Sequence, residues 1–195
     1  MRILMLASLI LFAACGPTTK IEKTWTDPSV SSSTVSPFQK ILFVALVKDA
    51  STRKMVEDRL VEQSGGRGVA SYNVLQPGDS KENEKEIAER LRQNGFDGAV
   101  VMRLANVEKN ADNVPGNSYG GWYGYYWLAY PDYNNSGYYS ANKVYYIETN
   151  IYSVSSNKLL WSGVTSTVNP SRTENMVDDI TRVIKKKLKE EGLMK

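Results

Sequence analysis

The sequence predicts an α/β fold, a two-layer sandwich in which helices pack on a mixed sheet of about five strands. Residues 38–104 follow the order strand, helix, strand, helix, strand, and this order favours parallel pairing with right-handed crossovers. Residues 144–164 have the pattern of an antiparallel hairpin. A last amphipathic helix follows the hairpin and completes the layer that covers the sheet.

The first predicted strand lies in residues 40–47, a continuous apolar run typical of a strand that is buried on both faces. Asp49 or Ser51 can cap the helix that follows, because short polar side chains accept hydrogen bonds from the first helical N–H groups. Val56 and Leu60 then share the inward face of that helix.

Two further elements complete the parallel part of the sheet. Residues 69–74 form a second predicted strand, and residues 82–93 a charged helix whose Ile87 and Leu91 face inward. Residues 99–104 form the third strand.

The C-terminal part predicts a hairpin and a helix. Residues 144–152 alternate, which places four side chains on one face: Tyr145, Ile147, Thr149 and Ile151. Ser171 and Glu174 have the spacing of a capping box that opens the last helix. The inward stripe of this helix is Val177, Ile180, Val183, Ile184 and Leu188. Lysines at 185–187 and 189 fit a solvated helix end better than a basic membrane-binding or RNA-binding patch.

Residues 1–14 have the features of a bacterial lipoprotein signal peptide. One charge, Arg2, precedes an apolar core that is too short to cross a bilayer. Ala13 and Ala14 precede Cys15, whose thiol can take a diacylglyceryl group. Phe12 stands where the usual signal has Leu, and this is the one departure from the pattern. Gly16 after the cysteine favours the outer membrane.

Residues 15–37 are expected to link the lipid to the folded domain, which spans residues 38–195. The segment is rich in Ser, Thr and Pro, a composition that cannot bury a core, so much of it should be a flexible tether. A short strand at residues 20–25 is the exception that its alternation allows.

Several short motifs in order resemble a group of small bacterial lipoproteins with a Trp-x-Asp-Pro segment near the N-terminus. The matching residues are 25–28, 38–44, 53, 57–58, 68–72, 95–101 and 160–163. The resemblance implies a lipoprotein and carries over no catalytic residue. The domain plan is also similar to that of the TolB N-terminal domain and of CsgG, a likeness of architecture alone.

An aromatic insert occupies about residues 110–142. It holds eight of the 12 tyrosines and two of the four tryptophans. Tyr and Trp combine apolar faces with polar edges, which suits binding surfaces. The insert could contact a protein partner, stack on a glycan or enter a membrane interface, or it could be a Gly/Tyr/Asn loop without a partner. The candidate binding residues are Trp122, Tyr123, Tyr125, Tyr126, Trp127 and Tyr130.

The residue inventory argues against an enzyme. The chain has no histidine and one cysteine, so the commonest general base and metal ligand is missing. Residues 116–120 match the G-x-S-x-G pattern by chance, because neither a base nor a following helix accompanies the serine. The glycines of residues 65–68 precede a strand, unlike a phosphate-binding loop. We expect no cofactor and no metal, and a formal charge of +3 gives no case for nucleic acid.

These observations predict an outer-membrane lipoprotein, tethered through Cys15 and facing the periplasm. Its domain is expected to be a non-catalytic interaction or assembly module with a protein partner in the envelope. The alternative is a lipoprotein that binds glycan or peptidoglycan through the aromatic insert.

Overall fold

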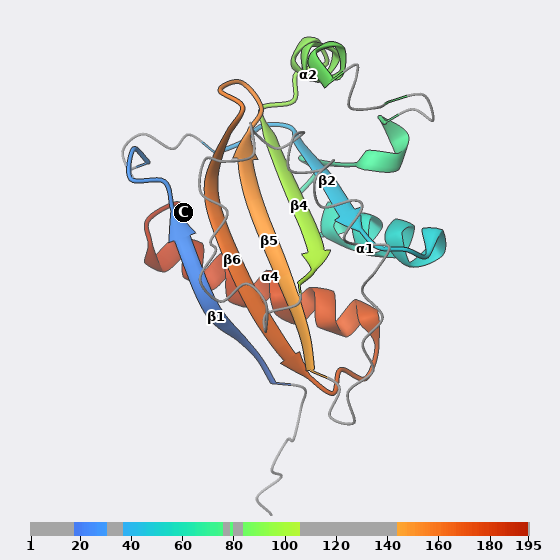
Figure 1. Ribbon diagram of the computed structural model, residues 1–195, viewed down its shortest axis with the longest axis vertical. Coiled ribbons are helices and arrows are strands. Elements are labelled where there is room, and N and C mark those ends of the chain that lie inside the picture. Colours follow the sequence, from blue (N-terminus) through green and yellow to red (C-terminus); the bar gives the residue numbers. More distant parts are fainter. Residues whose placement is uncertain (1–17, 31–36, 76–78, 80–83, 106–143, 195) are drawn as a thin grey trace, which may run out of the picture.

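The computed structural model describes residues 18–30, 37–75, 79, 84–105 and 144–194, and these residues form a mixed α/β fold (Figure 1). Six strands make one sheet in the order β1-β6-β5-β4-β2-β3. The strands are β1 (Thr18–Thr26), β2 (Ile41–Leu46), β3 (Gly68–Ala70), β4 (Gly98–Leu104), β5 (Val144–Ser153) and β6 (Lys158–Val168). The helices are α1 (Ala50–Glu62), α2 (Glu84–Gln93) and α4 (Thr173–Glu190), with a short 3-10 turn at Ser71–Asn73.

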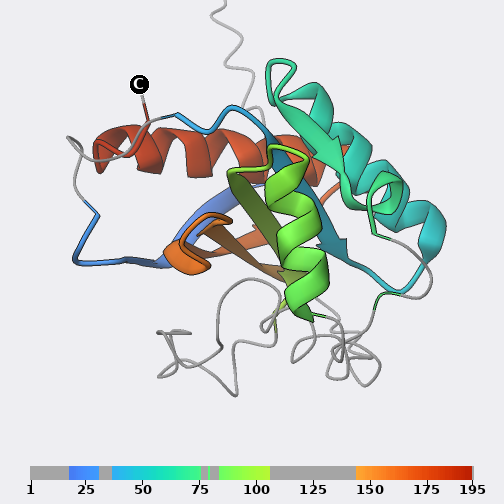
Figure 2. The same ribbon diagram turned by 90° about the horizontal axis from the view of Figure 1, so that it is seen from above.

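Helices α1 and α4 cover one face of the sheet and form the two-layer sandwich that the sequence predicts, while α2 packs on the other face (Figure 2). Strand β2 shows the division, because its side chains alternate between the two faces. Leu42, Val44 and Leu46 pack with Ile87 and Leu91 of α2. Phe43 and Ala45 pack with apolar residues of α1 and α4.

The strand directions bring several chain segments to one end of the sheet. Strand β2 runs parallel to β3 and β4, as predicted, whereas β5 is antiparallel to β4 and β6, and β1 is antiparallel to β6. Strands β2, β4 and β6 therefore end where β1 and β5 begin, at the lower edge of the sheet in Figure 1. We call this the basal end, marked by Thr18, Leu104, Val144 and Val168.

The short strand that the sequence allowed at residues 20–25 is the nine-residue strand β1, the sixth strand of the sheet. It pairs with β6 from Thr18 to Thr26, with a bulge between Ile21 and Lys23. The Glu191 carboxylate, which follows α4, accepts hydrogen bonds from the Thr26 hydroxyl at 3.0 Å and the Thr24 hydroxyl at 3.3 Å. Edge strand β1 is thus fixed both to the sheet and to the last helix.

The Trp161 side chain of β6 lies close over the backbone of Gly163, two residues further along the same strand. A Cβ atom on Gly163 would stand 2.2 Å from Cη2 of the Trp161 ring, so only glycine fits there. The indole Nε1 donates to Glu191 Oε2 at 2.9 Å, and 1% of the Trp161 surface is exposed. The same carboxylate therefore anchors β1, β6 and the end of α4.

The two helix starts on the basal end differ in their caps. Asp49 caps α1 as predicted, accepting from Thr52 N at 2.7 Å, and the Ser51 hydroxyl is the main cause that lowers the pKa of Asp49. The predicted capping box of α4 is wrong. Arg172 is the N-cap and no side chain caps the helix, because the Ser171 hydroxyl accepts instead from the Asn175 amide at 2.9 Å.

The second predicted strand is shorter than residues 69–74. Strand β3 ends at Ala70, and the chain turns into the 3-10 segment that follows. The cause is the buried carboxylate of Glu57, which accepts from Ser71 Oγ at 2.7 Å and from Tyr72 N at 3.3 Å. These bonds draw the chain away from the sheet and toward α1.

Candidate functional site

The residues that the sequence singled out for binding and anchoring lie outside the described residues. These are Cys15, Trp122, Tyr123, Tyr125, Tyr126, Trp127 and Tyr130, together with the G-x-S-x-G match at residues 116–120. Their nearest described neighbours are Thr18, Ala105 and Val144. All three of these neighbours lie at the basal end, so both segments join the domain there.

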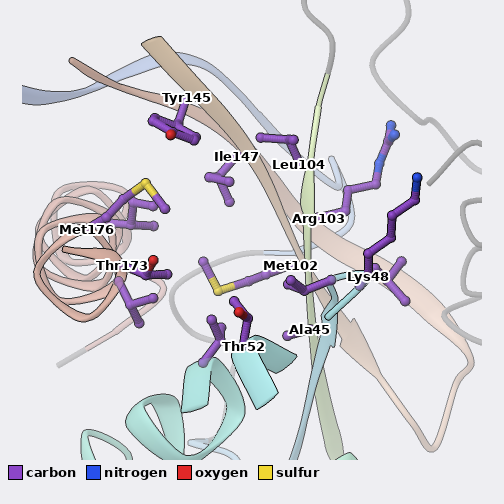
Figure 3. A pocket seen from close by; sticks show the side chains of 15 residues that line it. Ala45, Lys48, Thr52, Met102, Arg103, Leu104, Tyr145, Ile147, Thr173 and Met176 are labelled. Carbon is purple, nitrogen blue, oxygen red and sulfur yellow. The ribbon is translucent and has the colours of Figure 1, made fainter. Parts of the chain in front are cut away.

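An apolar cavity of about 280 Å³ opens at the same basal end, between helices α1 and α4 and the sheet (Figure 3). The sheet and the residue that follows β2 contribute Ala45, Leu46, Val47, Met102, Leu104, Tyr145 and Ile147, and the helices contribute Thr52, Val56, Thr173, Met176, Val177 and Ile180. Lys48 and Arg103 complete the lining. The volume lies near the lower end of small-ligand pockets, so the cavity suits one small apolar group.

The exposed fraction of the lining residues rises from the inner wall of the cavity to its mouth. Ala45, Val177 and Ile180 are 1–2% exposed and form the inner wall. Leu104 is 44% exposed and stands at the outer edge. The cavity is therefore a cleft with a closed inner end and an apolar mouth at the basal end.

Helices α1 and α4 are joined away from their first turns, and this arrangement leaves room for the cavity. Arg59 binds both carboxylate oxygens of Asp178, with Nε–Oδ1 and NH2–Oδ2 distances of 2.7 Å. Gln63 adds a bond to the same Oδ1 at 2.6 Å. Near the basal end the facing side chains are smaller, with Ala45 on the sheet and Thr52 and Thr173 on the first helical turns.

The position of Ala45 in the cavity wall is fixed by the buried Glu57 carboxylate. Glu57 is fully buried, and its Oε1 accepts from the Ala45 backbone N–H at 3.0 Å. Arg53 balances the charge, with an Nε–Oε1 distance of 3.0 Å. Strand β3 pairs with β2 only as far as Phe43. On that side of β2, the Ala45 N–H therefore lies beyond the end of the β2–β3 ladder. Glu57 thereby satisfies a donor that the sheet leaves open.

The lining has the chemistry to bind an apolar group. Met102 and Met176 have flexible, polarisable side chains that adapt to the shape of an apolar group. The Thr52 hydroxyl already donates to Asp49 Oδ2 at 2.8 Å. Lys48 and Arg103 extend to the same side, away from the other lining side chains (Figure 3), and Arg103 pairs with the buried Glu148 at 2.5 Å. Among the described residues that line the cavity there is no carboxylate.

Neither a metal-binding cluster nor a membrane-spanning helix is found among the described residues. No three His, Cys, Asp or Glu side chains in these ranges gather as a group that could hold a metal ion. None of the described helices has the length and apolar character needed to cross a membrane.

The fold and the cavity define an open-sheet α/β sandwich with an apolar cleft at one end. No family model matches the chain, and no curated protein does. The chain is similar to the PelC dodecamer from Paraburkholderia phytofirmans, with 10% identity and a TM-score of 0.41 over 86% of this chain and 94% of that chain. A single-residue variant of that dodecamer gives 12% identity and a TM-score of 0.41 over 86% and 95%.

A third solved structure is itself a bacterial lipoprotein. It is lipoprotein GNA1162 from Neisseria meningitidis, with 12% identity and a TM-score of 0.39 over 76% of this chain and 95% of that chain. TM-scores between 0.39 and 0.41 assign neither a family nor a function. The likeness to TolB and CsgG stays a prediction, and the function proposed below rests on the residues of this chain.

Proposed function

We propose that this chain is a lipid-anchored protein of the bacterial envelope whose domain binds an apolar group of a partner in the cavity between α1 and α4. The observation that carries the proposal is the lining of that cavity, made mostly of apolar side chains from its buried inner wall to Leu104 at its mouth. The domain is an interaction module and performs no catalysis. The sequence supports attachment through Cys15 and residence in the outer membrane, facing the periplasm.

Burial of apolar surface supplies the binding energy. Each methylene that leaves water contributes about 0.8 kcal/mol, so a group of four or so carbons gives about 3 kcal/mol before the cost of association. That amount suits an anchor residue within a larger interface. Met102 and Met176 widen the range of shapes that fit.

In-cell crosslinking tests the cavity as a binding site. A photo-crosslinking amino acid at position 104, on the mouth, should capture an envelope partner that mass spectrometry identifies. The same amino acid at position 156, in the turn at the far end of the sheet, serves as the control. Ala45→Leu, which fills the cavity, should abolish capture at position 104, whereas Ser156→Leu should leave it intact. Capture that survives Ala45→Leu, or that is equal at position 156, would contradict the proposal.

Labelled palmitate tests the anchor. The wild-type chain should incorporate label and sediment with the outer membrane, and Cys15→Ala should lose both properties. Incorporation that persists in Cys15→Ala would place the lipid elsewhere.

Composition favours one alternative, a glycan-binding role for the aromatic insert. In that case a defined sugar should shift tryptophan fluorescence, and Trp122→Ala and Trp127→Ala should remove the shift. An ester-cleaving activity abolished by Ser118→Ala would instead contradict both non-catalytic functions.

A further inference from the structure

Only a short stretch of chain separates the proposed lipid attachment from the folded sheet. Cys15 lies three residues before Thr18, where β1 begins. Three residues span at most about 11 Å even when fully extended. Thr18 pairs with Val168 at the basal end, so the acylated residue lies within that distance of this end of the sheet.

The apolar side chains that the domain leaves exposed gather at the same end. Within the described ranges, the exposed large hydrophobic residues are Leu104, at 44%, and Val168, at 38%. Leu104 closes β4 and Val168 closes β6. Two such residues are fewer than the contiguous patch that by itself marks an interface, so their weight comes from lying at the same end as the anchor.

Two further features fit a lipid surface at the basal end. The mouth of the apolar cavity opens there, beside Leu104. Lys48 is exposed there, and a lysine near anionic headgroups contributes about 1 kcal/mol to membrane attraction, whereas the exposed Lys20 pairs with Glu22 at 3.1 Å. The far end of the sheet ends instead in the polar turn Val154–Asn157 and the charged C-terminus of α4.

We infer that the basal end of the sheet lies against the lipid bilayer, with Leu104 and Val168 in contact with lipid, so that a partner whose apolar group enters the cavity must itself lie in or at this membrane. The inference rests on the lipid anchor of the proposed function, but not on what occupies the cavity. Its partner is the bilayer in which the Cys15 acyl chains are embedded. The sheet then stands on the membrane with its far end directed into the aqueous compartment.

Fluorescence quenching by lipid tests this orientation. The acylated full chain is placed in vesicles of phosphatidylcholine and phosphatidylglycerol with brominated acyl chains. Cys15 is the single native cysteine and is blocked by its lipid, so Leu104→Cys and Val168→Cys can each carry one fluorescent label. Ser156→Cys, exposed at the far end, is the matched control. Labels at positions 104 and 168 should lose fluorescence in brominated vesicles, and the label at position 156 should not.

Each possible outcome of this experiment bears on one proposal. Equal quenching at the three positions, or stronger quenching at position 156, overturns the orientation. Absence of quenching at 104 and 168 in protein that sediments with the vesicles also overturns it, since the residues are then covered by protein. Failure to sediment with the vesicles contradicts the anchor itself. Circular dichroism of each labelled variant confirms its fold, and the two basal positions check each other.

Discussion

Arg59 of α1 and Asp178 of α4 form a two-point ion pair that joins the two helices. The guanidinium presents two parallel N–H donors to the two oxygens of one carboxylate, the geometry that makes such pairs specific. The hydrogen bonds from Arg59 are the main cause that lowers the pKa of Asp178 below its ordinary value of 3.8. This ion pair links α1 and α4 in addition to the apolar packing between the two helices.

The Asp178 pair should give the protein an acid-sensitive contribution to stability. A lowered carboxyl pKa stabilises the folded state at pH values above the ordinary value, and this contribution is lost as the pH falls through the folded-state pKa. Asp178→Asn should therefore lower the free energy of unfolding at pH 7 by about 0.5 kcal/mol, and 1 at most, because the pair is partly exposed and screened. The difference from wild type should shrink as the pH falls below 3.8 and through the lowered folded-state pKa. Urea unfolding at several pH values measures it.

Asp179→Asn is the control for that series. Asp179 pairs with Arg182 inside α4 and joins no second helix. A loss at pH 7 as large as that of Asp178→Asn would show that the link between helices has no special weight.

Replacement of the buried Glu57 should be among the most damaging single changes in the domain. Glu57→Gln leaves the Arg53 charge without its partner and sets an amide donor against the Tyr72 N–H. Loss of one partner from a buried ion pair costs about 3–5 kcal/mol. Thermal unfolding should show a large drop in Tm. Glu62→Gln, at an exposed pair with Arg59, should change the Tm little, and an equal drop would contradict the role of burial.

Two buried alanines should respond differently to enlargement. Ala45 lines the cavity, whereas Ala99 packs in the core on the opposite face, and 0–1% of either residue is exposed. Ala99→Leu should destabilise the protein by about 1–3 kcal/mol through overpacking. Ala45→Leu should cost less than about 1 kcal/mol, because the cavity takes the added atoms. Chemical unfolding of both variants checks this, and equal losses would mean that the space near Ala45 is not free.

A methyl group on Gly163 should conflict with the Trp161 ring. Gly163→Ala places a carbon 2.2 Å from that ring, and we expect a loss of about 1–3 kcal/mol. Trp161→Phe shortens the ring, so the added cost of Gly163→Ala should be smaller in that background. The double-mutant cycle, followed by urea unfolding, measures the coupling. Additive costs would mean that the two residues do not touch.

The sequence allowed prediction of the elements that bury apolar side chains. Three predictions are confirmed within one or two residues: the strand at residues 40–47, the helix face with Ile87 and Leu91, and the hairpin. The second strand of the hairpin, β6, is longer than predicted. In each, hydrophobic periodicity alone identifies the element. Strand β1 was harder to predict because it is an edge strand of mostly polar residues. Its pairing with β6 and its bonds to Glu191 supply what its own composition lacks.

Other features depend on tertiary contacts and left weaker signals. Glu57 falls at i+4 from Arg53 on a helix, a spacing that usually marks an exposed pair. Its burial, and the early end of β3 that it causes, depend on how α1 meets β2. The cavity has no sequence pattern at all. It arises from the space between two helices that are 120 or so residues apart in the chain and are fixed by Arg59 and Asp178.

The edge position of β1 has a mechanical consequence. If the lipid at Cys15 holds the protein, any force between the membrane and the domain enters through Thr18 and runs along the axis of β1. A strand pulled along its own axis loads its hydrogen bonds with β6 together, in shear, so that they cannot open one after another. The bonds of Thr24 and Thr26 to Glu191 lie at the far end of the strand, where they resist its sliding. We therefore expect the domain to bear tension at its point of attachment without unravelling from its N-terminus.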